Sequence, residues 1–280
     1  MAIRLTDALR REYERLFESC DILPRHQAEV EHTVDRLVSH RDRYRSVTKR
    51  RGVPWHFVAL VHCMESGNSF RSHLHNGDPL TARTVRVPAG RPRQGTPPFS
   101  WEESAADAMA LKRLSGDTDW TLAGTLYQLE RYNGWGYRLY HPHVLSPYLW
   151  SFSNHYTSGR YVADGRWSDS AVSRQCGAAV LLRRMVERSL VDLADQPAAT
   201  LYATLAATPA EQARPEPLVS RHRMRRSAGA EETDQARRLQ RWLSGFPGIY
   251  LRVDGIPGDR TSDAYRLVTG DYLPGDPRGG

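Results

Sequence analysis

The sequence has few cysteines and no long hydrophobic run, and each scarcity excludes a class of protein. Three cysteines, Cys20, Cys63 and Cys176, are widely spaced and form no C-x-x-C arrangement. An odd number at such spacing excludes a disulfide framework and a cysteine-based zinc cluster, and favours buried free thiols. The longest apolar run, residues 57–64, contains His62 and is far shorter than the roughly 20 residues that cross a bilayer. We therefore expect no membrane span.

Lysine is almost absent from a chain that is otherwise rich in cations. The 280 residues include 39 Lys and Arg against 32 Asp and Glu, a net charge of +7, and only Lys49 and Lys112 are lysines. Such a surface favours polyanions: nucleic acid, anionic lipid or a carboxylate-rich cell wall. Charge alone does not choose among these partners. No nucleic-acid-binding motif, Walker loop, dinucleotide fingerprint or Gly-x-Ser-x-Gly elbow is present, so a specific nucleic-acid partner is not expected.

Apolar periodicity predicts a mainly helical α+β fold. The helix beginning near Pro54 is apolar over more than half of its circumference and must lie in the core. Turn residues and a short alternation of apolar and polar residues predict an irregular β-hairpin within residues 74–98. The expected helices, in order, are two in residues 5–48 separated at Pro24, one over 54–66, one from a capping box at Ser100 and Glu103, one capped by Asp117 or Asp119 and ending at Asn133, and one within 168–190.

Composition divides the chain into a large domain, a linker and a small module. We expect the main domain over residues 1–190, with the helices of residues 1–50 packed on it. Residues 191–232 are rich in Ala, Pro, Arg and Glu and read as a linker. Residues 233–280 form a module small for an independent fold. Its expected core consists of Leu239, Leu243, Leu251, Val253, Ala264 and Leu267.

Glu65 is the sharpest candidate for chemistry. It stands at the end of the most hydrophobic predicted helix, just before Gly67. Burial against apolar neighbours raises the pKa of a carboxyl group, as a proton donor near neutral pH requires. The alternative is a structural role in which Glu65 caps a turn or pairs with an arginine such as Arg71.

A second carboxylate, Asp78, lies in the predicted hairpin. Two carboxylates flanking a cleft are the apparatus of glycoside hydrolysis, one as acid and the other to activate water or stabilise positive charge. Thr84, or Thr81, can position the water. The alternatives are an ordinary Gly-Asp-Pro turn for Asp78 and plain strand positions for both threonines.

In this order, the motifs of residues 54–185 resemble the lysozyme-like superfamily of muramidases, chitosanases and lytic transglycosylases. Glu65-Ser66 is similar to the Glu-Ser signature at the end of the catalytic helix of these enzymes. The interval from Asp78 to Thr84 is similar to the Asp/Thr spacing of phage-type lysozymes. The resemblance implies that Glu65 is the general acid, that Asp78 and Thr84 assist it, and that Ser66 and Thr81 contact the substrate.

A later segment adds to this resemblance. Tyr132-Asn133-Gly134 is similar to the Tyr-Asn-Gly element that lines the sugar cleft of these enzymes. Trp135 and Tyr137, beside glycines, are the aromatic residues best suited to stacking on sugar rings. The Gly-Leu-Met-Gln element of many lytic transglycosylases is missing, which favours hydrolysis. The interval between the two carboxylates is longer than in phage lysozymes.

The carboxy-terminal module has its own resemblance. The core Val253-Asp254-Gly255-Ile256-Pro257-Gly258, followed by Thr261 and Ala264, resembles the peptidoglycan-binding-domain-1 repeat. The insertion FPGIY departs from that repeat. The module can therefore bind glycan or serve only as a buttress for the main domain.

Histidines offer a weaker metal alternative. His73, His75 and Asp78 can together supply two imidazoles and a carboxylate, and His141 and His143 can add to them. No H-E-x-x-H helix is present, and we expect neither metal nor cofactor.

The sequence thus predicts a monomeric glycosidase that cleaves β-1,4 bonds of peptidoglycan or a related amino-sugar polymer. The alternatives are a lytic transglycosylase that uses Glu65 alone and a non-catalytic wall-binding protein that kept the fold. The first residues are charged throughout and lack the apolar centre of a signal peptide. We expect synthesis in the cytoplasm and another export or release route to the periplasmic or extracellular wall.

Overall fold

The computed structural model describes residues 3–49, 51–163, 165–193, 220–222, 229–246 and 249–279. The chain divides into two compact units, Met1–Met185 and Val186–Gly280. The described part is predominantly helical and has one two-stranded antiparallel sheet, which agrees with the predicted mainly helical α+β class. Most of the linker predicted over 191–232 falls outside the described residues.

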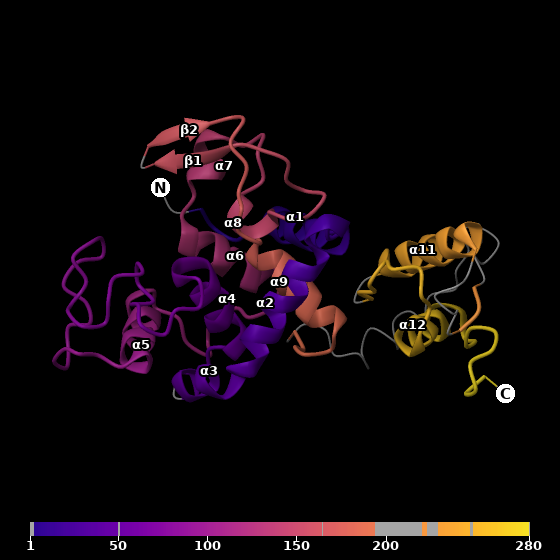
Figure 1. Ribbon diagram of the computed structural model, residues 1–280, viewed down its shortest axis with the longest axis horizontal. Helices are drawn as coiled ribbons and strands as arrows, with labels where there is room; N and C mark the ends of the chain where they lie inside the picture. The colour runs from indigo at the N-terminus through magenta and orange to yellow at the C-terminus, as the bar shows by residue number, and fades with distance from the viewer. Residues whose placement is uncertain are drawn as a thin grey trace. The chain divides into compact units, whose positions relative to one another are not determined.

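The first unit is a set of short helices with one hairpin (Figure 1). The break expected at Pro24 is present as a short 3-10 turn, and a further break at His40 divides the second predicted helix into α2 and α3. In chain order, the elements are α1 Asp7–Glu18, η1 Pro24–His26, α2 Gln27–Ser39, α3 Arg41–Thr48, α4 Trp55–Ser66, α5 Trp101–Leu111, α6 Leu122–Asn133, α7 Gly136–Tyr140, α8 Pro147–Trp150, β1 Arg160–Ala163, β2 Arg166–Ser168 and α9 Ala178–Glu187.

Helix α4 is the centre of the first unit, as its apolar circumference predicts. Every residue of α4 from His56 to Cys63 is buried, and the helix packs against α2, α3 and α6. Gly67 ends it with φ of 57°, a left-handed conformation that glycine adopts without strain. Glu65 and Ser66 therefore occupy the last turn, where the helix leaves the core.

The hairpin expected within residues 74–98 is not formed. Residues 67–100 make an irregular loop with one isolated antiparallel bridge, between Ser72 and Pro79. The alternating apolar positions Val85 and Val87 are 80% and 88% exposed, so no sheet face is buried there to hold a strand. The strands of the described chain lie instead at β1 and β2, which pair with Tyr161 opposite Trp167.

Two helix caps test the local predictions. The capping box of α5 is confirmed, since the Ser100 hydroxyl accepts from the Glu103 N–H and the Glu103 carboxylate accepts from the Ser100 N–H. The cap predicted for α6 is wrong, because Thr121, not Asp117 or Asp119, accepts from the N–H of Gly124. Asp119 binds the guanidinium of Arg10 in α1 and thereby links the two helices.

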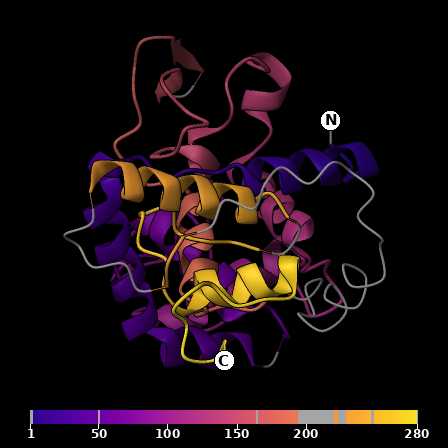
Figure 2. The ribbon, with the colours of Figure 1, turned by 90° about the vertical axis from the view of Figure 1, so that its right-hand side faces the viewer.

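The second unit contains α11 Ala230–Ser244 and α12 Asp259–Thr269, which pack on each other (Figure 2). Its core contains Leu239, Leu243, Leu251 and Ala264, as expected. The predicted Val253 and Leu267 are only partly buried. Ile249, Tyr265 and Leu273 complete the core, and Ile249 belongs to the FPGIY segment that departs from the repeat pattern.

Two general expectations can be compared with the described chain. Cys20, Cys63 and Cys176 are buried and free, as predicted. Within the described ranges, none of the helices combines the length and hydropathy that a bilayer crossing requires.

Candidate functional site

Glu65 lies in the last turn of α4, at the edge of the core. Tyr148 forms a hydrogen bond with its carboxyl group, and Lys112 interacts with it electrostatically. The Glu65 side chain is partly buried, and this burial raises the pKa of the carboxyl group. The hydroxyl of Tyr148 in α8 donates a hydrogen bond of 2.9 Å to Glu65 Oε1. This hydrogen bond and the charge of Lys112 both favour the carboxylate, but they do not cancel the effect of burial. The net result is a raised pKa, as the sequence predicts.

The Tyr148 phenol stays protonated over the whole physiological pH range, so it remains a hydrogen-bond donor to Glu65. Burial and the nearby carboxyl group of Glu65 raise the pKa of its phenol well above the ordinary value. Pro147 begins α8, where its fixed φ suits the first helical position, and so places Tyr148 opposite the last turn of α4. Tyr148 therefore holds the Glu65 side chain in one orientation.

Lys112 approaches the same carboxyl group from the end of α5. Its ammonium donates to the backbone oxygen of Tyr132 at 3.4 Å and lies 4.4 Å from the centre of the Tyr132 ring. Burial lowers the pKa of Lys112, and the attraction of Glu65 opposes that change. Tyr132, predicted to bind sugar, is buried, and its hydroxyl donates to the backbone oxygen of Leu74 at 3.1 Å. Tyr132 therefore contacts Lys112 and the backbone of the loop, and its role in this structure is to support the site.

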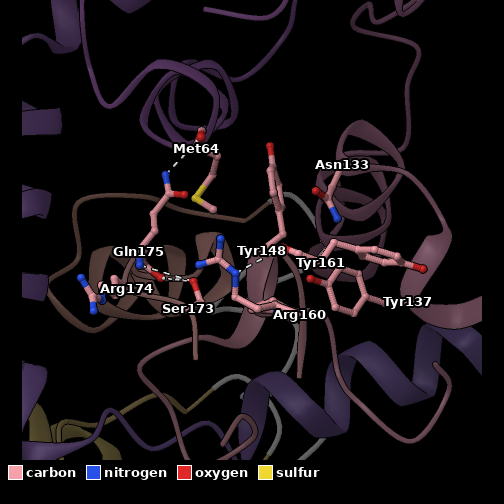
Figure 3. Close-up of a pocket in the computed structure, with 10 residues that line it drawn as sticks. Met64, Asn133, Tyr137, Tyr148, Arg160, Tyr161, Ser173, Arg174 and Gln175 are labelled. Carbon is pink, nitrogen blue, oxygen red and sulfur yellow. Dashed lines mark hydrogen bonds between the residues drawn. The ribbon is translucent and has the colours of Figure 1, made fainter. Parts of the chain in front are cut away.

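An open pocket of about 420 Å³ adjoins this cluster. Tyr148 lines the pocket and donates the hydrogen bond to Glu65, whereas Glu65 itself is not among the lining residues. Figure 3 shows the Tyr148 ring standing between Met64 and Asn133, with its hydroxyl at the end away from Arg160. The lining residues are Met64, Asn133, Tyr137, Pro147, Tyr148, Arg160, Tyr161, Ser173, Arg174 and Gln175.

The pocket wall is fixed to the end of α4 by Gln175. Its side-chain amide donates to the backbone oxygens of Cys63 and Met64, at 3.0 and 3.1 Å. Both carbonyls lie in the last turn of α4, and the Cys63 oxygen also accepts from the N–H of Gly67, at 3.1 Å. The Gln175 amide therefore links the pocket wall to the helix turn that carries Glu65.

Asp78 is placed differently from what a catalytic pair requires. Gly77 packs closely on the end of α4, since a Cβ there would lie 3.3 Å from the Glu65 backbone oxygen. The Asp78 carboxylate, however, accepts from the backbone N–H groups of Val85 and Arg86, at 2.9 and 3.0 Å, and pairs with the Arg86 guanidinium at 2.6 Å. It also accepts from the Asn76 amide. These contacts close the loop of residues 76–86 around Asp78.

The charge state of Asp78 follows from these donors. Burial alone would raise its pKa, but the hydrogen bonds from the backbone and side chain of Arg86 and from the N–H of Val85 outweigh burial and lower the pKa to about 2. The carboxylate is 3% exposed as a residue and ionised at neutral pH. Its predicted catalytic role stays a prediction, and the visible role is to hold the loop.

The predicted threonines and Ser66 also have local partners. The Thr84 hydroxyl donates to the backbone oxygen of Pro88 at 2.5 Å and accepts from the N–H of Arg91 at 2.9 Å. Thr81 is exposed on the same loop. Ser66 donates to the backbone oxygen of His62 at 3.1 Å, a bond within α4. None of these contacts involves the Glu65 carboxyl group.

Of the predicted residues Asn133, Trp135 and Tyr137, at the end of α6 and just after it, two face the pocket. Asn133 and Tyr137 line it, and Tyr137 makes edge contacts with Tyr161 and Trp167 of the hairpin. Trp135 packs instead on Tyr127, with ring centres 5.2 Å apart. The hairpin thus supplies one wall of the pocket through Tyr161.

His73 and His75 link the loop of residues 67–100 to α5 through polar contacts. His73 is 2.8 Å from the Ser104 hydroxyl through Nδ1, and His75 is 2.8 Å from the Asp107 carboxylate through Nε2. Asp107 also pairs with Arg91. The described residues contain no group of three or more His, Cys, Asp and Glu side chains able to hold a metal ion.

Comparisons with protein-family models, with curated proteins and with solved structures find no match to this chain. The chemistry of the site therefore rests on its own residues. A carboxyl group with a raised pKa, a fixed orientation and an adjoining pocket can donate a proton to a bound substrate.

Sequence reasoning placed Tyr148 among the aromatic residues suited to a sugar cleft, but it did not connect Tyr148 or Lys112 with Glu65, nor Arg160 and Gln175 with the pocket. These four residues come from separate segments, and their arrangement depends on how those segments pack. One signal was available for Lys112, because it is one of two lysines among 39 basic residues. A position that keeps lysine in a chain otherwise committed to arginine deserves inspection, since ammonium and guanidinium differ in geometry and in ease of deprotonation.

Proposed function

We propose that the protein cleaves β-1,4 glycosidic bonds of peptidoglycan or a related amino-sugar polymer, with Glu65 as the general acid. The observation that carries this proposal is the raised pKa of a single oriented carboxyl group beside an open, partly aromatic pocket. Tyrosine rings and amides in such a pocket suit the flat faces and hydroxyl groups of pyranose sugars. The lysozyme-like arrangement inferred from the sequence gives the same assignment for Glu65.

In the proposed reaction, protonated Glu65 gives its proton to the bridging oxygen as the bond from that oxygen to the anomeric carbon breaks. The positive charge that develops on the sugar ring is met by the new Glu65 carboxylate, and the Tyr148 hydrogen bond and Lys112 stabilise this carboxylate. Water then adds to the anomeric carbon and returns a proton to Glu65. Glu65 thus regains the proton that it gave to the leaving oxygen, and the reaction as written consumes one water for each bond cleaved.

A second outcome is favoured by the placement of Asp78. The loop donors occupy the Asp78 carboxylate, and in the described part of the chain Glu65 is the carboxyl group of raised pKa that bonds to a residue of the pocket wall. A mechanism with Glu65 alone is that of the lytic transglycosylase, in which a hydroxyl of the same sugar replaces water and an anhydro-sugar forms. Asn133 and Tyr137 contact the sugar in either reaction.

The test is digestion of purified peptidoglycan by the full-length protein and by Glu65→Gln, with product masses. New reducing ends from the wild type and none from E65Q support the proposal. Products lighter by one water identify the transglycosylase. Sedimentation with wall material without any product, in the wild type as well, identifies the wall-binding alternative and contradicts a catalytic Glu65.

A further inference from the structure

The pocket beside Glu65 contains positive charge that no carboxylate of the described residues neutralises. Arg160 and Arg174 both line it, and none of its ten lining residues is acidic. Among the described residues neither guanidinium has an ion-pair partner, and the Arg160 Nε donates only to the neighbouring backbone oxygen of Tyr161, at 3.3 Å. By contrast, Arg10, Arg91 and Arg138 elsewhere in this unit are paired with carboxylates.

The position of Arg160 is fixed by the hairpin that carries it. Gly159 precedes it with φ of 95°, and a Cβ there would lie 3.0 Å from both Trp167 and Val144, so this turn needs glycine. Tyr161 follows and contacts Tyr137 and Trp167. In Figure 3 the Arg160 guanidinium lies in the middle of the pocket below the Tyr148 ring, whereas Arg174 extends toward the edge.

We propose that this pocket binds a carboxylate-bearing substituent of the glycan, with the Arg160 guanidinium as its main contact and Ser173 and Gln175 as neutral neighbours. The inference rests on the proposed function and specifies its substrate class: a glycan strand that carries acidic groups is preferred over a neutral or cationic one. A planar guanidinium matches a carboxylate through two parallel hydrogen bonds. A volume of about 420 Å³ accommodates a sugar substituent or a few peptide atoms.

The location explains how such a contact serves the reaction. Tyr148 both lines the pocket and bonds to Glu65, so a substituent held by Arg160 brings the sugar that carries it toward the side of the pocket where the acid lies. Binding energy gained away from the reacting bond can thereby orient that bond. Unacetylated chitosan, whose amino groups are cationic, is disfavoured by the same charge.

The first experiment measures binding to the E65Q protein, which leaves the probe intact. The probes are a soluble peptidoglycan tetrasaccharide with free peptide carboxylates, its methyl ester, and chitotetraose. We expect the free acid to bind about tenfold or more tightly than the ester and chitotetraose, because a hydrogen-bonded charge pair is lost in both. Equal affinity for acid and ester, or no binding of the acid, overturns the proposal without any variant at Arg160.

The second experiment assigns the effect to Arg160. Arg160→Gln is expected to remove about tenfold in affinity for the acid and to strengthen chitotetraose binding slightly, because repulsion of its amino groups is reduced, and Arg160→Lys is expected to lose less affinity for the acid than Arg160→Gln. The matched control is Arg166→Gln, an exposed arginine of the same hairpin that does not line the pocket. A loss in R160Q no greater than in R166Q contradicts the assignment.

Failure of this inference is distinguishable from failure of the proposed function. In the otherwise wild-type enzyme, R160Q should raise KM for the carboxylated substrate with little change in kcat. Turnover that requires Glu65 but ignores the carboxylates retains the glycosidase and overturns the pocket's specificity. Selective binding that depends on Arg160 in a protein without turnover retains the pocket and overturns the glycosidase.

Discussion

The end of α4 and the loop that follows it contain two carboxyl groups that their surroundings drive in opposite directions. At the end of α4, Glu65 has one hydroxyl donor and a nearby ammonium, and burial dominates, so its pKa is raised. In the loop, Asp78 has two backbone N–H donors, an amide and a guanidinium, and its pKa is about 2. Both side chains are shielded from solvent to a large degree. The number and charge of the donors, more than burial itself, decide which group keeps its proton.

This difference separates two roles. A carboxyl group that is protonated near neutral pH can act as an acid, whereas one that stays ionised against several donors holds a structure together. The loop of residues 67–100 has little secondary structure, and the hydrogen bonds and ion pair of Asp78 hold its backbone together. The predictions below test this separation, starting with the largest effect.

Turnover should separate the two carboxyl groups most strongly. Glu65→Gln is expected to reduce peptidoglycan cleavage by about 10²–10⁴-fold, the range typical for loss of a general acid. Asp78→Asn should retain most of the activity at a temperature where it is folded. Rates of reducing-end formation under identical conditions give the comparison. Comparable losses in both variants would place Asp78 in the reaction.

Much of this arrangement could be predicted from the sequence, but only where the signal is local. The apolar circumference of α4, its end at Gly67 and the resulting burial of Glu65 depend on residues close in the chain. The same holds for the capping box at Ser100. Prediction failed where a short alternation of apolar and polar residues over 80–88 indicated a strand, because Val85 and Val87 are exposed and no sheet face is buried there.

The partners of the candidate acid could not be predicted, since they come from distant segments. Tyr148 is 83 residues from Glu65 in the chain, and the Gln175 bond to Cys63 spans 112 residues. No periodicity or spacing records such contacts. Composition gave one hint, at Lys112, and motif order identified Asn133 and Tyr137 as part of the right region.

Stability should respond to Asp78 in the opposite way from turnover. Asp78→Asn removes a charge that four N–H donors of the loop satisfy, and we expect it to cost about 1–3 kcal/mol of unfolding free energy. Urea denaturation at pH 7 measures this. The control Asp42→Asn removes an exposed carboxylate whose ion pair spans 3.8 Å and should cost far less.

The pH dependence of that cost has a fixed sign. Because folding lowers the pKa of Asp78, its stabilisation is present above the ordinary pKa of 3.8 and is lost as pH falls through about 2. The difference between wild type and D78N should shrink over that window. A difference that grows on acidification would show that Asp78 is not held as an anion.

The pH profile of turnover should respond to the two groups around Glu65. An acid catalyst loses activity as pH rises through its pKa. Tyr148→Phe removes a donor, and Lys112→Met removes a positive charge, both of which favour the carboxylate. Each variant should therefore move the alkaline limb of kcat/KM to higher pH, by up to about one unit.

Tyr140→Phe is the matched control for the tyrosine variant, because Tyr140 is 72% exposed. It should leave the limb in place. Movement of the limb to lower pH in Y148F or K112M would mean that these groups do not stabilise the Glu65 carboxylate.

The smallest expected effect is on the stability of the E65Q protein. Because folding raises the pKa of Glu65 above 4.5, ionisation of this group weakens folding as pH rises through that raised pKa. E65Q should thus melt slightly higher than wild type at pH 7, by about 2–4 °C for each kcal/mol relieved. The gain should vanish below the ordinary glutamate pKa, and calorimetry at two pH values checks it.

The most direct test is a carboxyl carbon NMR titration of the full-length protein, with E65Q and D78N to assign the two signals. The account predicts that Glu65 titrates above 4.5 and Asp78 near 2, so that between these two pH values Glu65 is mainly protonated and Asp78 mainly ionised. A Glu65 signal that titrates at or below 4.5 would contradict the assignment of this residue as the acid of the site.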